Sequence, residues 1–498
     1  MYFGHIMTLR FSPPFTALLL TATLSACMVG PDYVKPSAHL SKQFKEQKPW
    51  QPAQPRDHTP TGNWWEIFKD AQLNALEAQV ATANQSLIQA EAQYRQAQHL
   101  VQSAQSSLFP MVNSMASTNR FRAATGQSVA VSGVRNLFAT AISSAWEPDL
   151  WGGVRRQIEA NTGAAQASAA SLQALRLSMQ GNLADYYFQI KTLDAQKALL
   201  EETASAYNKA LTIIKNRYAV GVVAKSDVAK AETQLKATQA RAIDLGVQRA
   251  QLEHAVAVLI GKTPAEVSIR PNLATLEAPP LPLTLPSELL ERRPDIAAAE
   301  RRMASANAQI GVAKAAYFPS LNLAASNGLQ SGTLSTLFTA ARRYWALGPA
   351  GAALTLFDGG AKNAQYRQAI DSFDASVAGY RQTVLAGFQE VEDQLAAVRI
   401  LNTEIQVQNE AVAAADQALA LTINQYLSGM ISYQDVIIVQ TETLNNKQTA
   451  LQLQGRRLTA SVLLIKALGG GWHEKMLPSP EAASGDSKWT DYLIFPIN

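Results

Sequence analysis

The chain is poor in charge, aromatic residues and cysteine. Of its 498 residues, 16% are charged, 7% are aromatic and one is a cysteine, whereas 47% are hydrophobic. Disordered chains combine low hydrophobicity with high net charge, so this composition excludes that class. The 43 basic and 39 acidic residues give a net charge of +4, which is too balanced to indicate nucleic-acid binding. Beyond the N-terminal segment there is no long uncharged apolar run, which argues against a polytopic helical membrane protein.

Residues 1–26 have the pattern of a secretory signal peptide. Arg10 lies in a charge-poor start, the apolar stretch Phe15–Leu24 follows it, and small residues come next. Pro13 and Pro14 interrupt the uncharged run, and its apolar part is only about ten residues long, which is short for a membrane span. We therefore expect a cleaved signal rather than a transmembrane helix.

The sole cysteine lies at the end of this segment. Leu24–Cys27 reads Leu-Ser-Ala-Cys, the form of a bacterial lipobox. A lone cysteine has no partner for an internal disulfide, so it is a free thiol or a modified residue. We predict that cleavage leaves Cys27 as the first residue and that lipid chains attached to it anchor the protein, since each buried methylene contributes ~0.8 kcal/mol. No other cofactor is expected.

Short motifs recur at a spacing of about two hundred residues and in the same order. The pairs are Leu108–Pro110 with Tyr317–Pro319, Leu150–Gly153 with Phe357–Gly360, Tyr218–Gly221 with Tyr426–Gly429, and Leu259–Gly261 with Ala467–Gly469. The period is too long for a solenoid repeat, so the chain is predicted to be a duplicated unit.

Each unit is predicted to contain one helix, one β-hairpin and one long helical hairpin. The first unit spans 84–263, with a β-hairpin at 111–148 and a helical hairpin at 154–260. The second spans 294–471, with a β-hairpin at 320–357 and a helical hairpin at 361–468. Each hairpin strand has about the ~9–11 residues that a tilted membrane strand needs. The fold class is therefore mainly α with a small transmembrane β part.

The remaining segments lie outside the two units. They are an N-terminal segment at 27–83, a proline-rich linker at 264–293 and a C-terminal tail at 472–498. We expect the first two to pack around the waist of the molecule and residues 473–498 to be disordered. In the returning helices, Arg249 and Arg457 interrupt the apolar heptads, and we expect both to snorkel at the edge of a seam.

One copy of the chain has too few strands to close a barrel. The smallest common membrane barrels need about eight strands, and the two hairpins supply four. Open strand edges in lipid leave backbone groups unsatisfied at several kcal/mol each. Several copies are therefore expected to share one barrel that continues into a ring of helices.

Longer motifs give the chain a specific resemblance. They are Cys27–Tyr33, Trp64–Trp65, Trp146–Gly152, Glu291–Ile296 and Ala467–Trp472. Over residues ~20–472 the sequence resembles the TolC-like outer membrane factors, in the lipoprotein branch that serves resistance-nodulation-division efflux pumps. The resemblance implies a homotrimer whose 12-stranded β-barrel is continuous with a periplasmic α-barrel. It also implies a periplasmic adaptor and an inner-membrane transporter as partners, with outer membrane lipid around the barrel.

The same resemblance places two turns at the periplasmic entrance, where the adaptor docks. The residues concerned are Tyr218, Gly221 and Asp227 in the first unit and Tyr426, Gly429 and Asp435 in the second. The physical alternative for the two aspartates is ordinary capping of the returning helices. Many family members carry an aspartate constriction ring, whereas this chain has Ile438 at that position and Lys230 at its first-unit counterpart. An apolar ring resists hydrated ions by dewetting, so a low and weakly cation-selective resting conductance is expected.

Catalytic motifs are lacking from the sequence. There is no His-Glu-x-x-His, no Gly-x-Ser-x-Gly and no clustered Cys/His ligand set, so the chain is not expected to be an enzyme or a metal-binding protein. A passive exit duct for drugs or other small toxic compounds is the leading interpretation. A type I-like duct for proteins or metal ions and a structural coiled-coil lipoprotein without a pore remain alternatives.

Overall fold

The two halves of the chain fold as equivalent units in the computed structural model. It describes residues 28–37, 44–47, 63–122, 133–272, 278–279 and 289–485. The predicted signal 1–26, Cys27 and the last residues, 486–498, lie outside that range.

The first unit contains three helices and two strands: α3 (Gln85–Ser106), β1 (Met111–Arg122), β2 (Val134–Trp146), α4 (Gly153–Ala219) and α5 (Lys225–Leu259). The second contains the matching set: α7 (Pro294–Ala315), β3 (Ser320–Ser331), β4 (Arg343–Ala353), α8 (Ala361–Leu427) and α9 (Tyr433–Ala467). Matching long helices have equal lengths and begin 208 residues apart. The predicted fold class, mainly helical with a small sheet and two tandem repeats, is confirmed.

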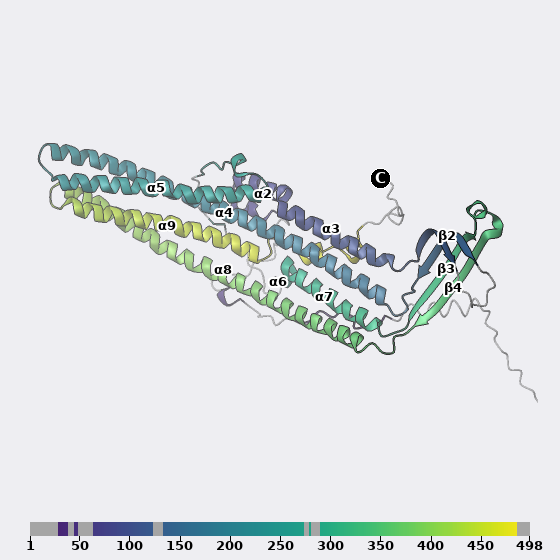
Figure 1. The fold of residues 1–498 in the computed structure, drawn as a ribbon. Coiled ribbons are helices and arrows are strands. Elements are labelled where there is room, and N and C mark those ends of the chain that lie inside the picture. The colour runs from purple at the N-terminus through teal and green to yellow at the C-terminus, as the bar shows by residue number, and fades with distance from the viewer. Residues whose placement is uncertain are drawn as a thin grey trace, which may run out of the picture.

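Short elements surround the repeats. They are η1 (Lys45–Gln47), η2 (Trp64–Phe68), α2 (Ala71–Ala83), η3 (Pro264–Glu266), α6 (Leu289–Arg292), η5 (Leu334–Thr336), η6 (Ala340–Arg342), η7 (Glu474–Met476) and α10 (Pro480–Ala483). Figure 1 shows the sheet at one end of an elongated molecule and the α4–α5 and α8–α9 turns together at the other.

The four strands form one antiparallel sheet in the order β1-β2-β3-β4. Phe138 of β2 pairs with Ser331 of β3, so the two repeats are joined within the sheet. The ladder between β3 and β4 shifts between Leu323 and Ala325. Many apolar side chains on the strands are exposed, including Met115, Ile142 and Leu347, the last at 82%. Among the described residues, strands β1 and β4 each have one edge without a partner strand.

The long helices α4 and α8 each contain 67 residues. At 1.5 Å per residue each is about 100 Å long. Both begin after a glycine with positive φ, Gly152 at 76° and Gly360 at 92°. The left-handed conformation is accessible to glycine without steric cost, which explains the recurring Gly-Gly pair at the junction with the sheet.

The helices lie in the order α3, α4, α7, α8, and each packs against the next. At the other end of the molecule, α4 packs against both α5 and α9, while α8 packs against α9. Consequently α3, α5 and the outer face of α8 lie at the edges of the chain. Among the described residues, every helix is too short or too polar to cross a membrane.

The main apolar core lies at the waist, where α2 and η2 pack on α4. Trp64, Leu73 and Tyr187 are buried in it. Asp70 caps α2, and its carboxylate accepts hydrogen bonds from the Tyr187 hydroxyl at 2.8 Å and the Lys191 ammonium at 3.1 Å. Burial alone raises the pKa of Asp70, but these hydrogen bonds outweigh it and the pKa is lowered.

The expectation that Arg249 snorkels at a seam edge is wrong. Its guanidinium pairs with Asp194 at 2.6 Å and Glu253 at 3.0 Å, and it donates to the Ile269 carbonyl oxygen at 2.7 Å. Glu253 also accepts from the Ile269 amide. The backbone carbonyl and amide groups of the buried Ile269 therefore hold the proline-rich linker on α5. Arg457, at the equivalent place, has one side-chain hydrogen bond among the described residues, a 3.5 Å contact with Asn402.

The expected disorder of the C-terminal tail is also wrong for residues 473–485, which we name the strap. It lies along α3 and α4 and contains η7 and α10. Ala483 is fully buried against Val101 and Ala165. The Gln98 amide donates to the Ala482 carbonyl oxygen at 3.2 Å and that of Gln166 donates to Pro478 at 3.0 Å. The strap is ordered because the apolar side of α10 is buried, although its polar composition did not indicate a packed segment.

Candidate functional site

Both helical hairpins reverse at a glycine. Gly221 has φ of 74° and Gly429 has φ of 79°. The amide of Gly221 donates to the Tyr218 carbonyl oxygen at 2.9 Å, and the amide of Gly429 donates to that of Tyr426 at 3.0 Å. Among the described residues, apart from the glycine itself and its two chain neighbours, no heavy atom lies within 4 Å of a Cβ added at either glycine. These turns need the left-handed backbone and present it openly, as a surface for a partner requires.

An aromatic cluster joins the two turns. The rings of Tyr426 and Tyr433 lie 5.5 Å apart, and the guanidinium of Arg217 lies 5.0 Å from the centre of the Tyr426 ring. Burial raises the pKa of Tyr433 to about 12. Tyr207 of α4 also packs in this cluster, so the first hairpin contacts the second through aromatic side chains. The two predicted tip tyrosines have different surroundings. Tyr426 packs in this cluster, whereas Tyr218 is 44% exposed.

The two tip aspartates have different roles. Asp435 accepts hydrogen bonds from the Ser432 amide at 3.0 Å and the Ser432 hydroxyl at 2.7 Å, and these bonds lower its pKa. The capping interpretation is therefore correct for Asp435. It is wrong for Asp227, because the N-cap of α5 is Ala224, which has no hydroxyl, and no side-chain bond caps this helix. Asp227 instead lies 3.9 Å from the Lys230 ammonium.

The residues predicted to form a constriction lie one helical turn beyond the aspartates. Ile438 is 55% exposed on α9 while its neighbour Ile437 packs toward the aromatic cluster. Lys230 occupies the equivalent position on α5 and its side chain is 42% exposed. Both side chains therefore project away from the core of the single chain.

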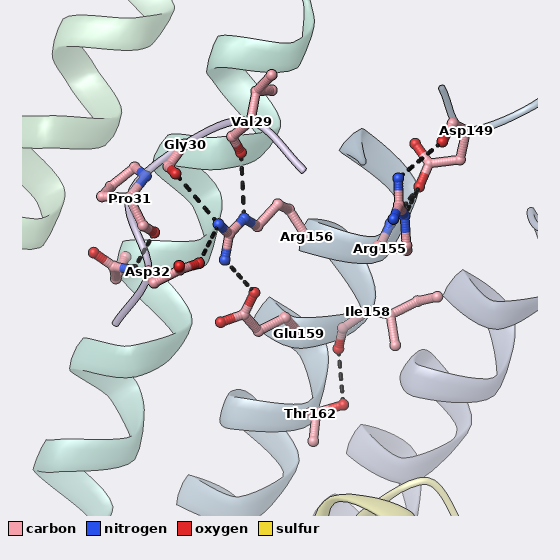
Figure 2. Close-up of polar contacts among 11 residues, drawn as sticks. Val29, Gly30, Pro31, Asp32, Asp149, Arg155, Arg156, Ile158, Glu159 and Thr162 are labelled. Carbon is pink, nitrogen blue, oxygen red and sulfur yellow. Dashed lines mark hydrogen bonds and ion pairs between the residues drawn. The ribbon is translucent and has the colours of Figure 1, made fainter. Parts of the chain in front are cut away.

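At the opposite end of the helices, the first described residues are gripped by a buried arginine. We name residues 28–33 the anchor segment, because they follow Cys27. Arg156 of α4 is 1% exposed and binds the carbonyl oxygens of Val29 and Gly30 at 3.3 Å each and the Asp32 carboxylate at 2.7 Å. Glu159 accepts a further bond at 2.7 Å. Figure 2 shows the guanidinium pointing into the segment.

Small residues let the anchor segment lie close to the helices. A Cβ on Gly30 would lie 2.5 Å from the Gly311 Cα atom, and one on Gly152 would lie 2.5 Å from the Met28 side chain. The Asn307 amide donates to the Pro31 carbonyl oxygen at 2.9 Å. Cys27 itself is not described, but its neighbour Met28 is fixed at the junction of helices and sheet.

The last residue of the anchor segment, Tyr33, lies in an ionic cluster. The Tyr33 hydroxyl donates to Glu300 at 2.5 Å, and Arg301 also donates to Glu300, with one bond of 2.7 Å. Burial and the neighbouring carboxylate raise the pKa of Tyr33. Sequence reasoning quoted residues 28–33 as a motif but missed Arg156 as their receptor. An arginine near the start of a long helix carries no pattern that reveals its partner 124 residues away.

The two sites differ in what they offer to a partner. Among the described residues no group of three or more His, Cys, Asp or Glu side chains is arranged to hold a metal ion. The tips offer open backbone and exposed side chains, whereas the anchor segment is a peptide seated in a fitted groove.

Comparison with known proteins identifies the family. Residues 75–262 and 285–470 match the family described as Outer membrane efflux protein. The chain is 30% identical over 476 residues to the probable efflux pump outer membrane protein TtgC of Pseudomonas putida, covering 94% of this chain and 98% of that one. It is 27% identical over 464 residues to the cation efflux system protein CusC of Escherichia coli, covering 93% and 98%.

Solved structures agree with this assignment. The outer-membrane channel OprN has a TM-score of 0.81 at 28% identity and covers 90% of this chain and all of its own. The open MtrE channel of Neisseria gonorrhoeae has a TM-score of 0.79 at 25% identity and covers 90% and 99%. The match in both repeats and over nearly the full length shows that the chain belongs to the outer membrane efflux protein family and is a channel protein of the outer membrane, not an enzyme.

Proposed function

We propose that three copies of the chain form the exit duct of a tripartite efflux pump, with a lipid on Cys27 as an additional anchor. The observation that carries the proposal is the pair of open edges, on β1 and β4, in a sheet whose apolar side chains are exposed. Unpaired strand edges are costly in lipid, and closing them between copies removes that cost. Three copies of four strands make a barrel of twelve.

The internal repeat predicts how neighbouring copies meet. Within the chain, α4 contacts α9 where Thr192 lies against Gly455. The residues 208 positions away from these two are Ile400 on α8 and Val247 on α5, which are 53% and 60% exposed. In the assembly α8 takes the place of α4, and α5 of the next copy takes the place of α9. Two exposed apolar side chains thereby become one buried contact.

The duct would carry drugs or other small toxic compounds. Relatives at 30% identity are named for toluene and antibiotic efflux, and CusC is named for cation efflux. The periplasmic adaptor would dock on the tips at Tyr218, Gly221 and Asp227 and at Tyr426, Gly429 and Asp435, and an inner-membrane transporter of the resistance-nodulation-division class would supply the energy. The exposed glycine backbone of both turns supports this placement.

Substitution of the tip glycines tests the adaptor contact. Gly221→Val and Gly429→Val place a bulky side chain on an open turn with positive φ, at a cost of roughly 1–2 kcal/mol in local strain. Cells carrying either variant should accumulate an efflux substrate as cells lacking the channel do, although the protein reaches the outer membrane and assembles normally. Val220→Ala, at an exposed neighbour without positive φ, is the matched control. Unchanged efflux with intact adaptor cross-linking in the glycine variants would refute the contact.

A further inference from the structure

The anchor segment and the strap lie in equivalent grooves of the two repeats. Asn307 on α7 donates to the Pro31 carbonyl oxygen, and Gln98, at the equivalent place on α3, donates to that of Ala482. Gly30 lies against Gly311, and the equivalent of Gly311 is Gln102, whose amide nitrogen is 3.2 Å from a Cβ placed on Gly485.

The two peptides have unrelated sequences and run in opposite directions. The anchor segment runs from Met28 at the sheet end toward Tyr33 and Glu300. The strap runs from His473, which follows Trp472 at the waist, toward Gly485 and the sheet end. Gly30 and Gly485 both have positive φ, at 103° and 70°. The groove, and not the peptide, is what the duplication preserved.

The two grooves differ in their walls. The anchor segment has a helix on each side of α7, since Arg156 of α4 binds it on one side and Tyr33 packs on the other against the apolar cluster that contains Tyr380 of α8. Among the described residues the strap has a single wall, where Ala483 packs on Ala165 of α4. Helix α3 is the edge of the chain on its other side.

We infer that the missing wall is α8 of a neighbouring copy, so that the strap is an intersubunit contact. This inference rests on the proposed homotrimer. Glu159 on α4 accepts a hydrogen bond from Arg156, the residue that binds the anchor segment. The equivalent position on α8 is Arg367. It is exposed in the single chain.

The charge of the strap fits that position. Glu481 precedes Ala482, whose backbone is equivalent in place to that of Pro31, and it is exposed. The position on α8 equivalent to Arg156 is Ala364. The neighbouring copy therefore has no arginine there to bind the backbone of the strap. Arg367 of one copy instead faces the Glu481 carboxylate of the next, and an arginine and a carboxylate form a strong, directional pair.

Cysteine cross-linking in membranes tests the contact. The double variant Arg367→Cys/Glu481→Cys is treated with a bis-maleimide that spans about 10 Å, because an ion pair holds its Cα atoms farther apart than a disulfide permits. We expect covalent dimers and trimers on a denaturing gel. The matched control, Val407→Cys/Glu481→Cys, moves one cysteine 40 residues along the same helix, about 60 Å away, and should remain monomeric on the gel.

A second pair separates failure of the inference from failure of the proposed trimer. Ile400→Cys/Val247→Cys probes the seam between α8 and α5 and should cross-link copies whether or not the strap takes part. Cross-linking of this pair without cross-linking of the strap pair would overturn the inference and leave the trimer standing. Failure of both pairs would overturn both. As a further readout, Arg367→Glu and Glu481→Arg should each lower the temperature at which the trimer dissociates, and combining them should restore it.

Discussion

The two repeats have nearly the same backbone but different surroundings. Helices α4 and α8 are equally long, as are α5 and α9, and each pair begins 208 residues apart. Several side chains that differ between the repeats meet non-repeated parts of the chain. Arg249 holds the linker while Arg457 does not, and Arg156 holds the anchor segment where α8 has Ala364. Duplication thus fixed the duct wall, and single substitutions adapted each half to its own neighbours.

The largest contrast is predicted between two arginines at equivalent positions. Arg249→Ala leaves Asp194, 5% exposed, buried without its cation and releases the linker at Ile269. Breaking a buried pair in this way costs about 3 kcal/mol or more. Arg457→Ala is the matched control and should cost less than about 1 kcal/mol, because among the described residues its side chain makes one long hydrogen bond, to Asn402. Denaturant unfolding of both purified variants measures the difference, and equal losses would contradict it.

The second prediction concerns Glu77 on α2, which packs on α4 and α3 of the first repeat. Its side chain is fully buried, neither carboxylate oxygen has a hydrogen-bond partner among the described residues, and burial raises its pKa to about 9. The folded state therefore keeps a proton that the unfolded state releases above pH ~4.5. Stability should fall as the pH rises from about 4.5 to 9, by about 3 kcal/mol at pH 7.

Glu77→Gln removes this titration without changing the shape of the side chain. Unfolding free energies of the variant and the parent should be similar near pH 4.5 and should diverge as the pH rises, with the variant more stable at pH 8. Parallel pH profiles for the two proteins would show that Glu77 is ionised in the folded state.

A smaller effect is expected from exchanging the helix caps of the two tips. Ser432→Ala removes one hydrogen bond to Asp435 and should cost about 1 kcal/mol, seen as faster hydrogen exchange in the first turn of α9. Ala224→Ser should slow exchange in the first turn of α5 by giving Asp227 the same partner. Because hydrogen bonds from Ser432 lower the pKa of Asp435, its contribution is full at neutral pH and is lost only as the pH falls through that lowered pKa. Unchanged exchange in both variants would remove the capping role.

Substitution of Ile438 should have the smallest effect on stability and the largest effect on ion selectivity. Ile438 and Lys230 occupy equivalent positions, are exposed in the single chain and are proposed to line the constriction. Ile438→Asp should leave folding unchanged and turn a low, weakly cation-selective conductance into a cation-selective one in planar bilayers. Ile437→Asp is the matched control, because that side chain packs toward the aromatic cluster and should destabilise the tip instead. Strong cation selectivity in the unmodified channel would contradict the assignment.

The sequence predicted periodic features well and unique contacts poorly. The recurring Gly-Gly pair, the Phe-Pro helix ends and the two glycine turns each have one physical meaning, so they indicated the repeats and reversals directly. Arg156 binds the anchor segment, Arg249 holds the linker, and the strap packs along α3 and α4. Each of these contacts joins residues far apart in the chain, and no local sequence pattern predicts them. Cys27 lies outside the described residues, so its lipidation stays a prediction.

The central claim is that separate copies close one wall around a common bore. Native mass spectrometry of the detergent-solubilised protein tests it most directly. The account predicts three copies of the chain as the dominant species, and a stable monomer at the same concentration would contradict it.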